Sequence, residues 1–361
     1  MDQPEVLTEV RGQIGCITLN RPKALNALSL GMVRALYAAL RQWEHDPGVL
    51  AIAIRGSDRE GPFGAFCAGG DIRFLYQAAR EGDPRVEDFF TEEYILNHLT
   101  HHLTKPYIAF MDGIVMGGGM GISQGASLRI VTERTKMAMP ETGIGLFPDV
   151  GGGHFLSRCP GRAGEWLALT GETVGAGDAV ALCLADVVLP SQRLADLWEA
   201  LCVQTFADGA AVQKWIASQA IAADADHTCD FAKIDHYFSL PDVPAIVAAL
   251  EAAEGEWERA TAALLRQRSP LMLHVVLRQI RRARAMTLAE DLRMERDLVR
   301  HCFHLRPGQS ETLEGIRALA VDKDRSPRWN PARIEDVDPQ LVDAFFASPW
   351  PAALHPLAAL A

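Results

Sequence analysis

The segment MGGGMGISQG, residues 116–125, fits two different kinds of active site. Its second half, GISQG at 121–125, fits the G-x-S-x-G elbow, a strand-to-helix turn that presents a nucleophilic serine. Its first half holds three consecutive glycines at 117–119, whose backbone N–H groups could bind an anion. The segment therefore predicts either a serine nucleophile or an oxyanion hole whose chemistry is carried out by other residues.

The position of the preceding strand disfavours the elbow. Residues 107–111, YIAFM, are predicted to form a strand, and Ser123 follows its end by twelve residues instead of standing in the turn. Residues 118–126 fit a helix of small side chains, in which Ser123 is a buried packing residue. The glycines lack the G-x-G-x-x-G spacing and the lysine of phosphate-binding loops. An oxyanion hole near a helix N-terminus is favoured, and glycines for tight packing remain the alternative.

Strands and helices alternate around this segment. Apolar, β-branched runs predict strands at 13–19, 49–54, 107–111 and 128–131. A helix is predicted to begin at the cap residue Ser29, with one apolar face made of Met32, Leu36, Ala39, Leu40 and Trp43. This alternation indicates an α/β fold with a largely parallel sheet, in which ligands bind beyond the carboxyl ends of the strands. The glycine-rich loops 63–71 and 113–121 are therefore the candidate site loops.

The pattern of predicted secondary structure changes after about residue 189. Residues 192–206, 242–267 and 271–303 show helical periodicity, and no convincing strand separates them. We therefore expect an α/β core over residues 1–190 and a helical region over residues 191–361, packed on that core.

Composition narrows the class of protein. The chain has 361 residues and a formal charge of −11, which disfavours nonspecific binding to nucleic acid. Its seven cysteines are scattered along the sequence with no C-x-x-C pair, which is typical of reduced thiols. No apolar run approaches transmembrane length, and the first residues resemble no targeting signal. We expect a cytoplasmic protein with no nucleic-acid or membrane partner.

Two carboxylates stand in the apolar loop MPETGIGLFPDVGGG at residues 139–153. Glu141 and Asp149 lie eight residues apart among glycines, prolines and large apolar side chains. Burial raises the pKa of a carboxyl group, and two nearby carboxyl groups push their pKa values apart. This arrangement suits acid–base or nucleophilic chemistry. The alternative is that Asp149 caps a helix that begins after Val150.

Three histidines at 98, 101 and 102 have the i, i+3, i+4 spacing of metal ligands on a helix. No matching set of carboxylates or cysteines accompanies them. An ordinary solvated or core helix face is therefore favoured, and no metal site is predicted.

Four segments together resemble the enoyl-CoA hydratase/isomerase, or crotonase, superfamily. They are ITLNRPKALNAL (17–28), AFCAGGDI (65–72), MDGIVMGGGMGIS (111–123) and MPETGIGLFPDVGGG (139–153). EEYILN (92–97) and LEGIRALAVDKDRSPRWNP (313–331) extend the resemblance to a hydrolase branch and to nearly the whole chain. The resemblance implies a crotonase/ClpP-like spiral of ββα units with two nearly perpendicular sheets, followed by helices. This replaces the simple doubly wound sheet.

The resemblance also implies roles for individual residues. The backbone N–H groups of Gly70 and Gly118 would form the oxyanion hole for a thioester carbonyl, which gains negative charge in the transition state. Glu141 would be the catalytic carboxylate, and Asp149 would take the second polar position. Glu93 would contact a 3-hydroxyl group of the substrate.

A coenzyme A moiety would run along residues 21–25 and the backbone of residues 68–72. The implied contacts are Lys23, Ala24, Ala68, Asp71 and Ile72. Lys23 or Arg21 would meet the CoA phosphates, although an exposed loop cation is more often only a solvated surface charge.

The implied activity is hydrolysis of 3-hydroxyisobutyryl-CoA, or a close short-chain 3-hydroxyacyl-CoA, to the free acid and CoA in valine breakdown. Hydratases of the superfamily carry a second glutamate where this chain has Gly121, which disfavours hydration. An enoyl-CoA isomerase, a hydratase and a noncatalytic acyl-CoA-binding protein remain the alternatives, with a serine hydrolase last. No metal or redox cofactor is expected, and a homo-oligomer, trimer or hexamer, is an open expectation.

Overall fold

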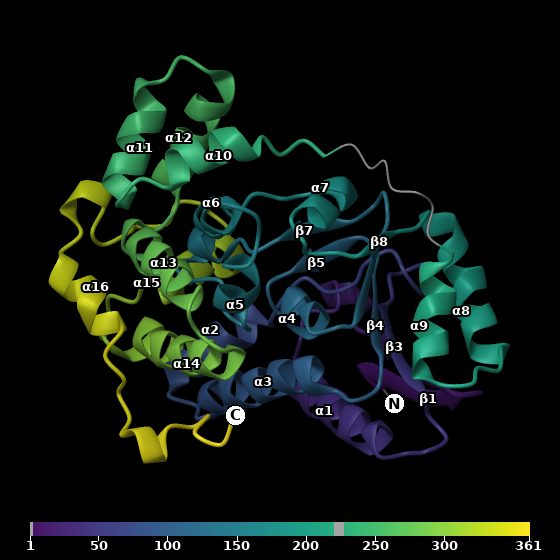
Figure 1. Cartoon of the computed structure of the whole chain (residues 1–361). Helices are drawn as coiled ribbons and strands as arrows, with labels where there is room; N and C mark the ends of the chain where they lie inside the picture. The colour runs from purple at the N-terminus through teal and green to yellow at the C-terminus, as the bar shows by residue number, and fades with distance from the viewer. Residues whose placement is uncertain (1–2, 220–226) are drawn as a thin grey trace. The chain divides into compact units, whose positions relative to one another are not determined.

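The computed structural model describes residues 3–219 and 227–361 (Figure 1). The chain forms two compact units, each assembled from three separate segments. Unit 1 comprises Met1–Gly70, Ile95–Ala138 and Thr173–Thr228; unit 2 comprises Asp71–Tyr94, Met139–Glu172 and Cys229–Ala361. The units interleave along the chain, whereas the predicted boundary divides it once near residue 190, and that boundary stays a prediction.

Unit 1 is built on a six-stranded sheet with the order β1-β2-β3-β4-β6-β8. Its strands are β1 (Val6–Arg11), β2 (Ile14–Leu19), β3 (Ala51–Gly56), β4 (Tyr107–Met111), β6 (Leu128–Val131) and β8 (Val187–Val188). Only the β1–β2 pair is antiparallel, since each later pair is parallel. A second, parallel sheet pairs β5 (Ile114–Met116) with β7 (Lys136–Ala138). The predicted α/β class and largely parallel sheet are confirmed.

Helices cover the large sheet of unit 1. They are η1 (Pro22–Ala24), α1 (Leu30–Glu44), α4 (Gly118–Gln124), α7 (Ala176–Ala181), η3 (Ser191–Arg193), α8 (Leu194–Val203) and α9 (Gly209–Ala217). The Ser29 hydroxyl accepts a hydrogen bond from the Met32 N–H at 3.2 Å, and all five predicted apolar residues of α1 are buried. One face of the sheet packs on α8 and α9 around the buried Trp198 (Figure 1).

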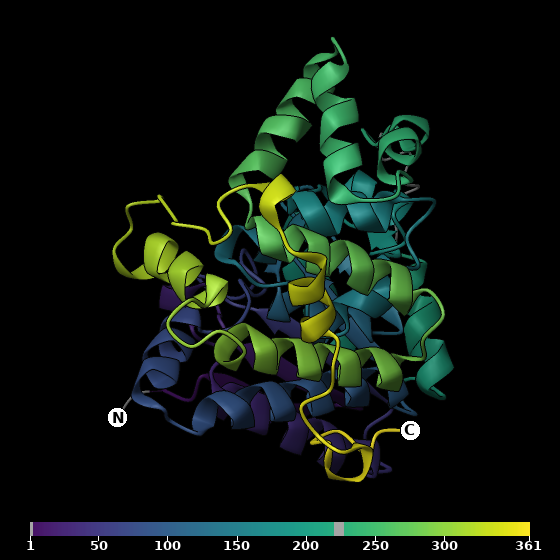
Figure 2. The same ribbon diagram turned by 90° about the vertical axis from the view of Figure 1, so that its left-hand side faces the viewer.

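Unit 2 is helical. It contains α2 (Ile72–Glu81), η2 (Glu141–Ile144), α5 (Gly152–Leu156), α6 (Ala163–Thr170), α10 (Phe231–Phe238), α11 (Val243–Ala252), α12 (Glu256–Gln267), α13 (Pro270–Ala283), α14 (Leu288–His304), α15 (Glu311–Ile316), η4 (Arg317–Val321), η5 (Ile334–Asp336), α16 (Pro339–Phe345) and η6 (Ala352–Leu354). The green pair α11 and α12 forms a helical hairpin (Figures 1 and 2). The long helix α3 (Arg85–His102) contributes residues to both units.

Two helix predictions were too long. The helix predicted over 242–267 is α11 and α12, because the chain leaves helical geometry at Ala253 and restarts after Gly255. The helix predicted over 271–303 is α13 and α14, because Thr287 and Glu290 form a capping box that begins a new helix. Apolar residues keep a helical spacing across both breaks, so the sequence pattern did not predict them. No helix within the described residues is both long and apolar enough to cross a membrane.

Candidate functional site

The two glycine-rich loops of unit 1 lie side by side. Cys67 forms a parallel bridge with Val115 of β5, and the Met116 N–H donates to the Cys67 carbonyl at 2.9 Å. A Cβ atom added to Gly69 would lie 3.8 Å from the amide nitrogen of Gly118. The structure therefore brings the loop that ends at Gly70 next to the start of α4, where Gly118 stands.

Gly118 is the first residue of α4, and Gly117 precedes it with a φ of 48°. The first N–H groups to bond back within the helix are those of Met120 and Gly121, which donate to the Gly117 carbonyl at 2.8 and 3.1 Å. The Gly118 N–H precedes them, at the positive end of the helix dipole, where it has no acceptor within the helix. The packing alternative holds for Gly119, because a Cβ there would lie 2.4 Å from the Cys67 carbonyl oxygen.

Ser123 is a helix residue, and the elbow interpretation is wrong. It stands six positions into α4, fully buried, and not in a turn after a strand. Its hydroxyl donates to carbonyl oxygens of the same helix, at 2.8 Å to Gly119 and 3.2 Å to Met120. These bonds satisfy the hydroxyl locally and hold it within α4.

Two buried polar side chains fix the loop that leads to Gly70, and the sequence analysis missed both. The Asn26 amide donates to three loop carbonyls, those of Ser57, Ala65 and Phe66, at 2.8 to 3.1 Å. Its φ of 57° is a conformation that asparagine tolerates better than most residues. Asn26 therefore ties the segment after β2 to the oxyanion loop.

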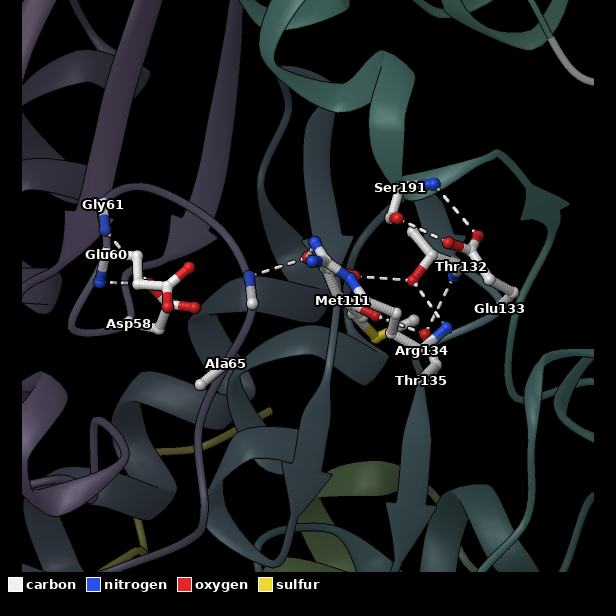
Figure 3. Close-up of polar contacts among 12 residues, drawn as sticks. Asp58, Glu60, Gly61, Ala65, Met111, Thr132, Glu133, Arg134, Thr135 and Ser191 are labelled. Atoms are coloured by element: carbon white, nitrogen blue, oxygen red, sulfur yellow. Dashed lines mark hydrogen bonds and ion pairs between the residues drawn. The ribbon is translucent and has the colours of Figure 1, made fainter.

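Asp112, directly after β4, is the second anchor. Its carboxylate accepts the Gly64 N–H at 2.7 Å and the Thr132 hydroxyl at 2.6 Å. Arg134 adds an ion pair to the same carboxylate (Figure 3). Figure 3 also shows Asp58 accepting the N–H groups of Glu60 and Gly61, which closes the turn that begins the loop. Fixed loop geometry is what a preorganised oxyanion donor requires.

Among the buried carboxyl groups of unit 2 are the three that the sequence analysis singled out, Glu93, Glu141 and Asp149. Burial, followed by the charge of Asp149, raises the pKa of both Glu93 and Glu141 well above the usual range. Burial also raises the pKa of Asp149 to about 7. One oxygen of Glu93 and one of Glu141 are buried without a hydrogen-bond partner among the described residues. Such orphaned, mutually coupled carboxyl groups are a frequent sign of a reactive site.

Asp149 is held by Tyr94, which the sequence analysis did not identify. The buried Tyr94 hydroxyl donates to the Asp149 carboxylate at 2.9 Å. The cap alternative is wrong, because α5 begins at Gly152 after Gly151 and no side chain caps it. Val150 has a φ of 58°, which is unusual for a β-branched residue and indicates that the loop is held under strain.

The strained loop is held by side chains of α13 and α14. Glu295 accepts the N–H groups of Gly151 at 2.7 Å and Gly153 at 2.9 Å. Gln279 donates to the Pro148 carbonyl at 2.7 Å, and Asp291 accepts the His154 N–H at 2.7 Å. All three side chains are fully buried. They follow the loop by more than 120 residues, so no local pattern could reveal them.

The residues predicted to contact CoA have mixed environments. The Ala68 N–H donates to the Leu25 carbonyl at 3.0 Å. Asp71 caps α2 by accepting the Phe74 N–H at 3.2 Å, and Ile72 begins that helix. Lys23 is exposed in η1, which Ala24 ends.

A groove in unit 2 is lined in part by cationic side chains that the sequence analysis did not single out. It has a volume of about 640 Å³ and lies between α2 and η4. Arg73, Tyr76, Arg80 and Lys323 are among its lining residues. Arg73 and Arg80 are seven positions apart, a spacing that places them on one helix face.

The histidines of α3 contact each other and their own helix. His98 and His102 stack on each other with ring centres 4.0 Å apart, and His102 bonds to the His98 carbonyl. Within residues 3–219 and 227–361, no group of three or more His, Cys, Asp or Glu side chains is arranged to hold a metal ion.

Asp149→Asn is expected to stabilise the protein at pH 8. The pKa of Asp149 is about 7 in the folded protein against an ordinary value of 3.8, so between these two pH values the folded state keeps a proton that the unfolded state has lost. Stability is therefore full below pH 3.8 and falls as the pH rises through 7. The neutral amide avoids this cost, which reaches up to about 4 kcal/mol.

Thermal unfolding from pH 5 to pH 8 checks this expectation. The melting temperature of Asp149→Asn relative to the wild type should rise with pH, whereas the exposed control Asp336→Asn should show no such trend. A relative melting temperature that falls with pH would contradict the raised pKa.

Comparisons with known proteins identify the family of the chain. The family model described as Enoyl-CoA hydratase/isomerase matches residues 14–346. The chain is 41% identical to rat mitochondrial 3-hydroxyisobutyryl-CoA hydrolase and 38% identical to the human protein of that name, in each case over 95% of this chain and 89% of the relative.

Solved structures give the same family. A carnitinyl-CoA dehydratase from Mycobacterium thermoresistibile has a TM-score of 0.86 and 37% identity, over 96% of this chain and 97% of the other. An enoyl-CoA hydratase from Rhodobacter sphaeroides has a TM-score of 0.85 and 37% identity, over 99% and 100%. The crotonase-like fold is therefore confirmed, and the chain belongs to the enoyl-CoA hydratase/isomerase family.

Proposed function

We propose that the chain hydrolyses 3-hydroxyisobutyryl-CoA, or a close short-chain 3-hydroxyacyl-CoA, to the free acid and CoA, a step of valine breakdown. The observation that carries the proposal is Glu141, a buried carboxyl group with one unpartnered oxygen in an apolar loop. Relatives named 3-hydroxyisobutyryl-CoA hydrolase, similar over 95% of this chain, support the choice of substrate.

The proposed reaction assigns each group one task. The N–H groups of Gly70 and Gly118 bind the carbonyl oxygen and stabilise the charge that develops on it. Glu141 either attacks the carbonyl carbon, giving a mixed anhydride that water then cleaves, or removes a proton from the attacking water. Asp149, with a pKa of about 7, holds a proton near neutral pH that it can give to the departing thiolate. Glu93 binds the 3-hydroxyl group.

Hydration and isomerisation on the same fold are the alternatives. Two similar solved structures carry the names of a dehydratase and a hydratase. Hydratases of the superfamily place a second acid where this chain has Gly121, and a buried glycine supplies no proton. Hydrolysis needs only one carboxylate, an oxyanion hole and an acid for the leaving group, and the chain has candidates for all three.

The CoA phosphates are proposed to meet cationic side chains. Lys23 is exposed, whereas Arg21 pairs with Glu5 at 3.0 Å and is the weaker candidate. Arg73 and Arg80 of the unit 2 groove offer two guanidinium groups, which suit phosphate binding. Ala24, Ala68, Asp71 and Ile72 remain proposed contacts of the CoA chain.

Location and assembly are also part of the proposal. A cytoplasmic location is proposed because the seven cysteines are scattered along the sequence with no paired spacing, although the vertebrate relatives are named mitochondrial. Assembly into a homo-oligomer, trimer or hexamer, is proposed from the superfamily. Cell fractionation and light scattering test the two statements.

Thiol release distinguishes the alternatives. Purified protein is supplied with 3-hydroxyisobutyryl-CoA and, separately, with crotonyl-CoA, while free CoA thiol and the enoyl chromophore are followed. We expect thiol release from the first substrate and no loss of the chromophore from the second. Absence of thiol release from 3-hydroxyisobutyryl-CoA would sink the hydrolase proposal, and loss of the chromophore would favour hydration.

A further inference from the structure

Two cysteines far apart in sequence meet in the core of unit 1. Cys16 of β2 and Cys202 of α8 are 186 residues apart, yet their sulfur atoms lie 3.4 Å from each other. Both side chains are buried. A disulfide needs a separation of about 2.05 Å, so the sulfur atoms are within about 1.4 Å of bonding distance.

The backbone around this pair is fixed. A Cβ on Gly12, in the turn between β1 and β2, would lie 2.4 Å from the Cys202 carbonyl oxygen, so the turn touches the end of α8. The Gln13 side chain accepts the Phe206 N–H at 2.8 Å, and Arg11 forms a bidentate pair with Glu199 at 2.9 and 2.6 Å. These contacts hold β2 and the end of α8 together at the place where the two sulfur atoms lie 3.4 Å apart.

Hydrogen bonding and nearby charges shift the pKa values of the two thiols in opposite directions. The hydrogen bond with Cys16, assisted by Arg11 and Arg55, lowers the pKa of Cys202. The same hydrogen bond, together with burial, raises the pKa of Cys16. Arg55 is held beside the pair, because its guanidinium stacks 4.1 Å from the Trp198 ring and donates to Thr18. Cys202 is the sulfur favoured as a thiolate, and a thiolate is the form that peroxides oxidise.

A surface groove gives small molecules access to Cys16. The groove has a volume of about 700 Å³ and is lined by residues of β1, β2 and β3 and of the 57–62 loop. Cys16, Thr18 and Arg55 are among its lining residues. The groove is far larger than hydrogen peroxide, so an oxidant of that size can reach Cys16 without unfolding of the sheet, and the Cys202 sulfur lies 3.4 Å from the Cys16 sulfur.

We propose that Cys16 and Cys202 are a peroxide-reactive site that closes into a disulfide between β2 and α8. The thiolate of one cysteine attacks one oxygen of hydrogen peroxide, the O–O bond breaks, and hydroxide leaves and takes a proton as water. The sulfur of the other cysteine then attacks the resulting sulfenic acid; the S–S bond forms, the S–O bond breaks, and a second water leaves. Two electrons from the two thiols reduce one peroxide.

Thiol mapping of the full-length protein tests the site. The protein is treated with hydrogen peroxide, unfolded in denaturant, alkylated and digested, and the peptides of all seven cysteines are weighed. We expect Cys16 and Cys202 to lose alkylation together, to appear as one linked peptide pair lighter by two hydrogen atoms, and to recover with dithiothreitol. The exposed Cys183 is the internal control for peroxide exposure.

Single variants test the pairing. In Cys16→Ser and in Cys202→Ser, dimedone should trap a sulfenic acid on the cysteine that remains, and neither variant should form the linked peptide pair. If either variant fails to fold, the wild-type mapping alone decides. The proposal is overturned if Cys183 is oxidised while both Cys16 and Cys202 remain alkylatable, or if the linked peptides join other cysteines.

Discussion

Glu141→Gln is expected to lower kcat for thioester hydrolysis by about 10³-fold or more. The amide keeps the size of the side chain but can neither attack the thioester nor accept a proton from water. Glu141 is buried in η2, so a neighbouring acid cannot easily replace it. Steady-state release of CoA thiol, compared with the wild type at saturating substrate, measures the effect.

The matched control is Glu172→Gln, an exposed glutamate of the same unit, which should retain wild-type kcat. A Glu141→Gln enzyme with an unchanged melting temperature and a kcat within tenfold of the wild type would remove Glu141 from the reaction. A single turnover in labelled water separates the two routes. Label that enters the Glu141 carboxylate supports the anhydride, because water that attacks the thioester directly would place label in the product acid alone.

Gly118→Pro is expected to lower kcat by about 10²- to 10³-fold, the usual effect of losing one oxyanion donor. Proline removes the N–H while keeping the backbone, because Gly118 is the first residue of α4 and proline is well tolerated there. The loss should fall on kcat more than on KM, since the donor stabilises the transition state more than the bound substrate.

Ala176→Pro is the matched control, because Ala176 also begins a short helix after a glycine in unit 1. It should leave kcat unchanged if proline at this helix position is harmless. Circular dichroism and thermal unfolding confirm that both variants are folded. Wild-type kcat in a folded Gly118→Pro protein would refute the proposed donor.

The local elements of the fold could be predicted from the sequence. The strands at 107–111 and 128–131 and the helix capped by Ser29 appear as expected, because each is set by neighbouring residues. The strand predicted from residue 49 begins two residues later, at Ala51. The helix breaks at 253–255 and 284–287 were not predicted, because apolar residues keep a helical spacing across them. Gly255 and Thr287, which precede the first residues of α12 and α14, are nevertheless residue types that often begin a helix.

The supports of the candidate site could not be predicted, for a physical reason. Asn26, Asp112, Tyr94 and Glu295 act on backbone or carboxylate groups that are 31 to 144 residues away. A buried polar residue in an isolated sequence does not reveal which distant group it satisfies. The glycine and carboxylate motifs therefore indicated where chemistry would occur, while the residues that hold those motifs in place emerged only from the fold.

The contact between Glu295 and Gly151 has a consequence for how the protein is made. Translation delivers the 148–153 loop first, and the α14 glutamate that holds it follows 144 residues later. At ordinary rates of synthesis that delay is roughly 7 to 30 seconds. During this interval the growing chain already contains Glu141 and Asp149 but has nothing to keep their loop in its strained conformation, so catalytic competence should arise only after α14 leaves the ribosome.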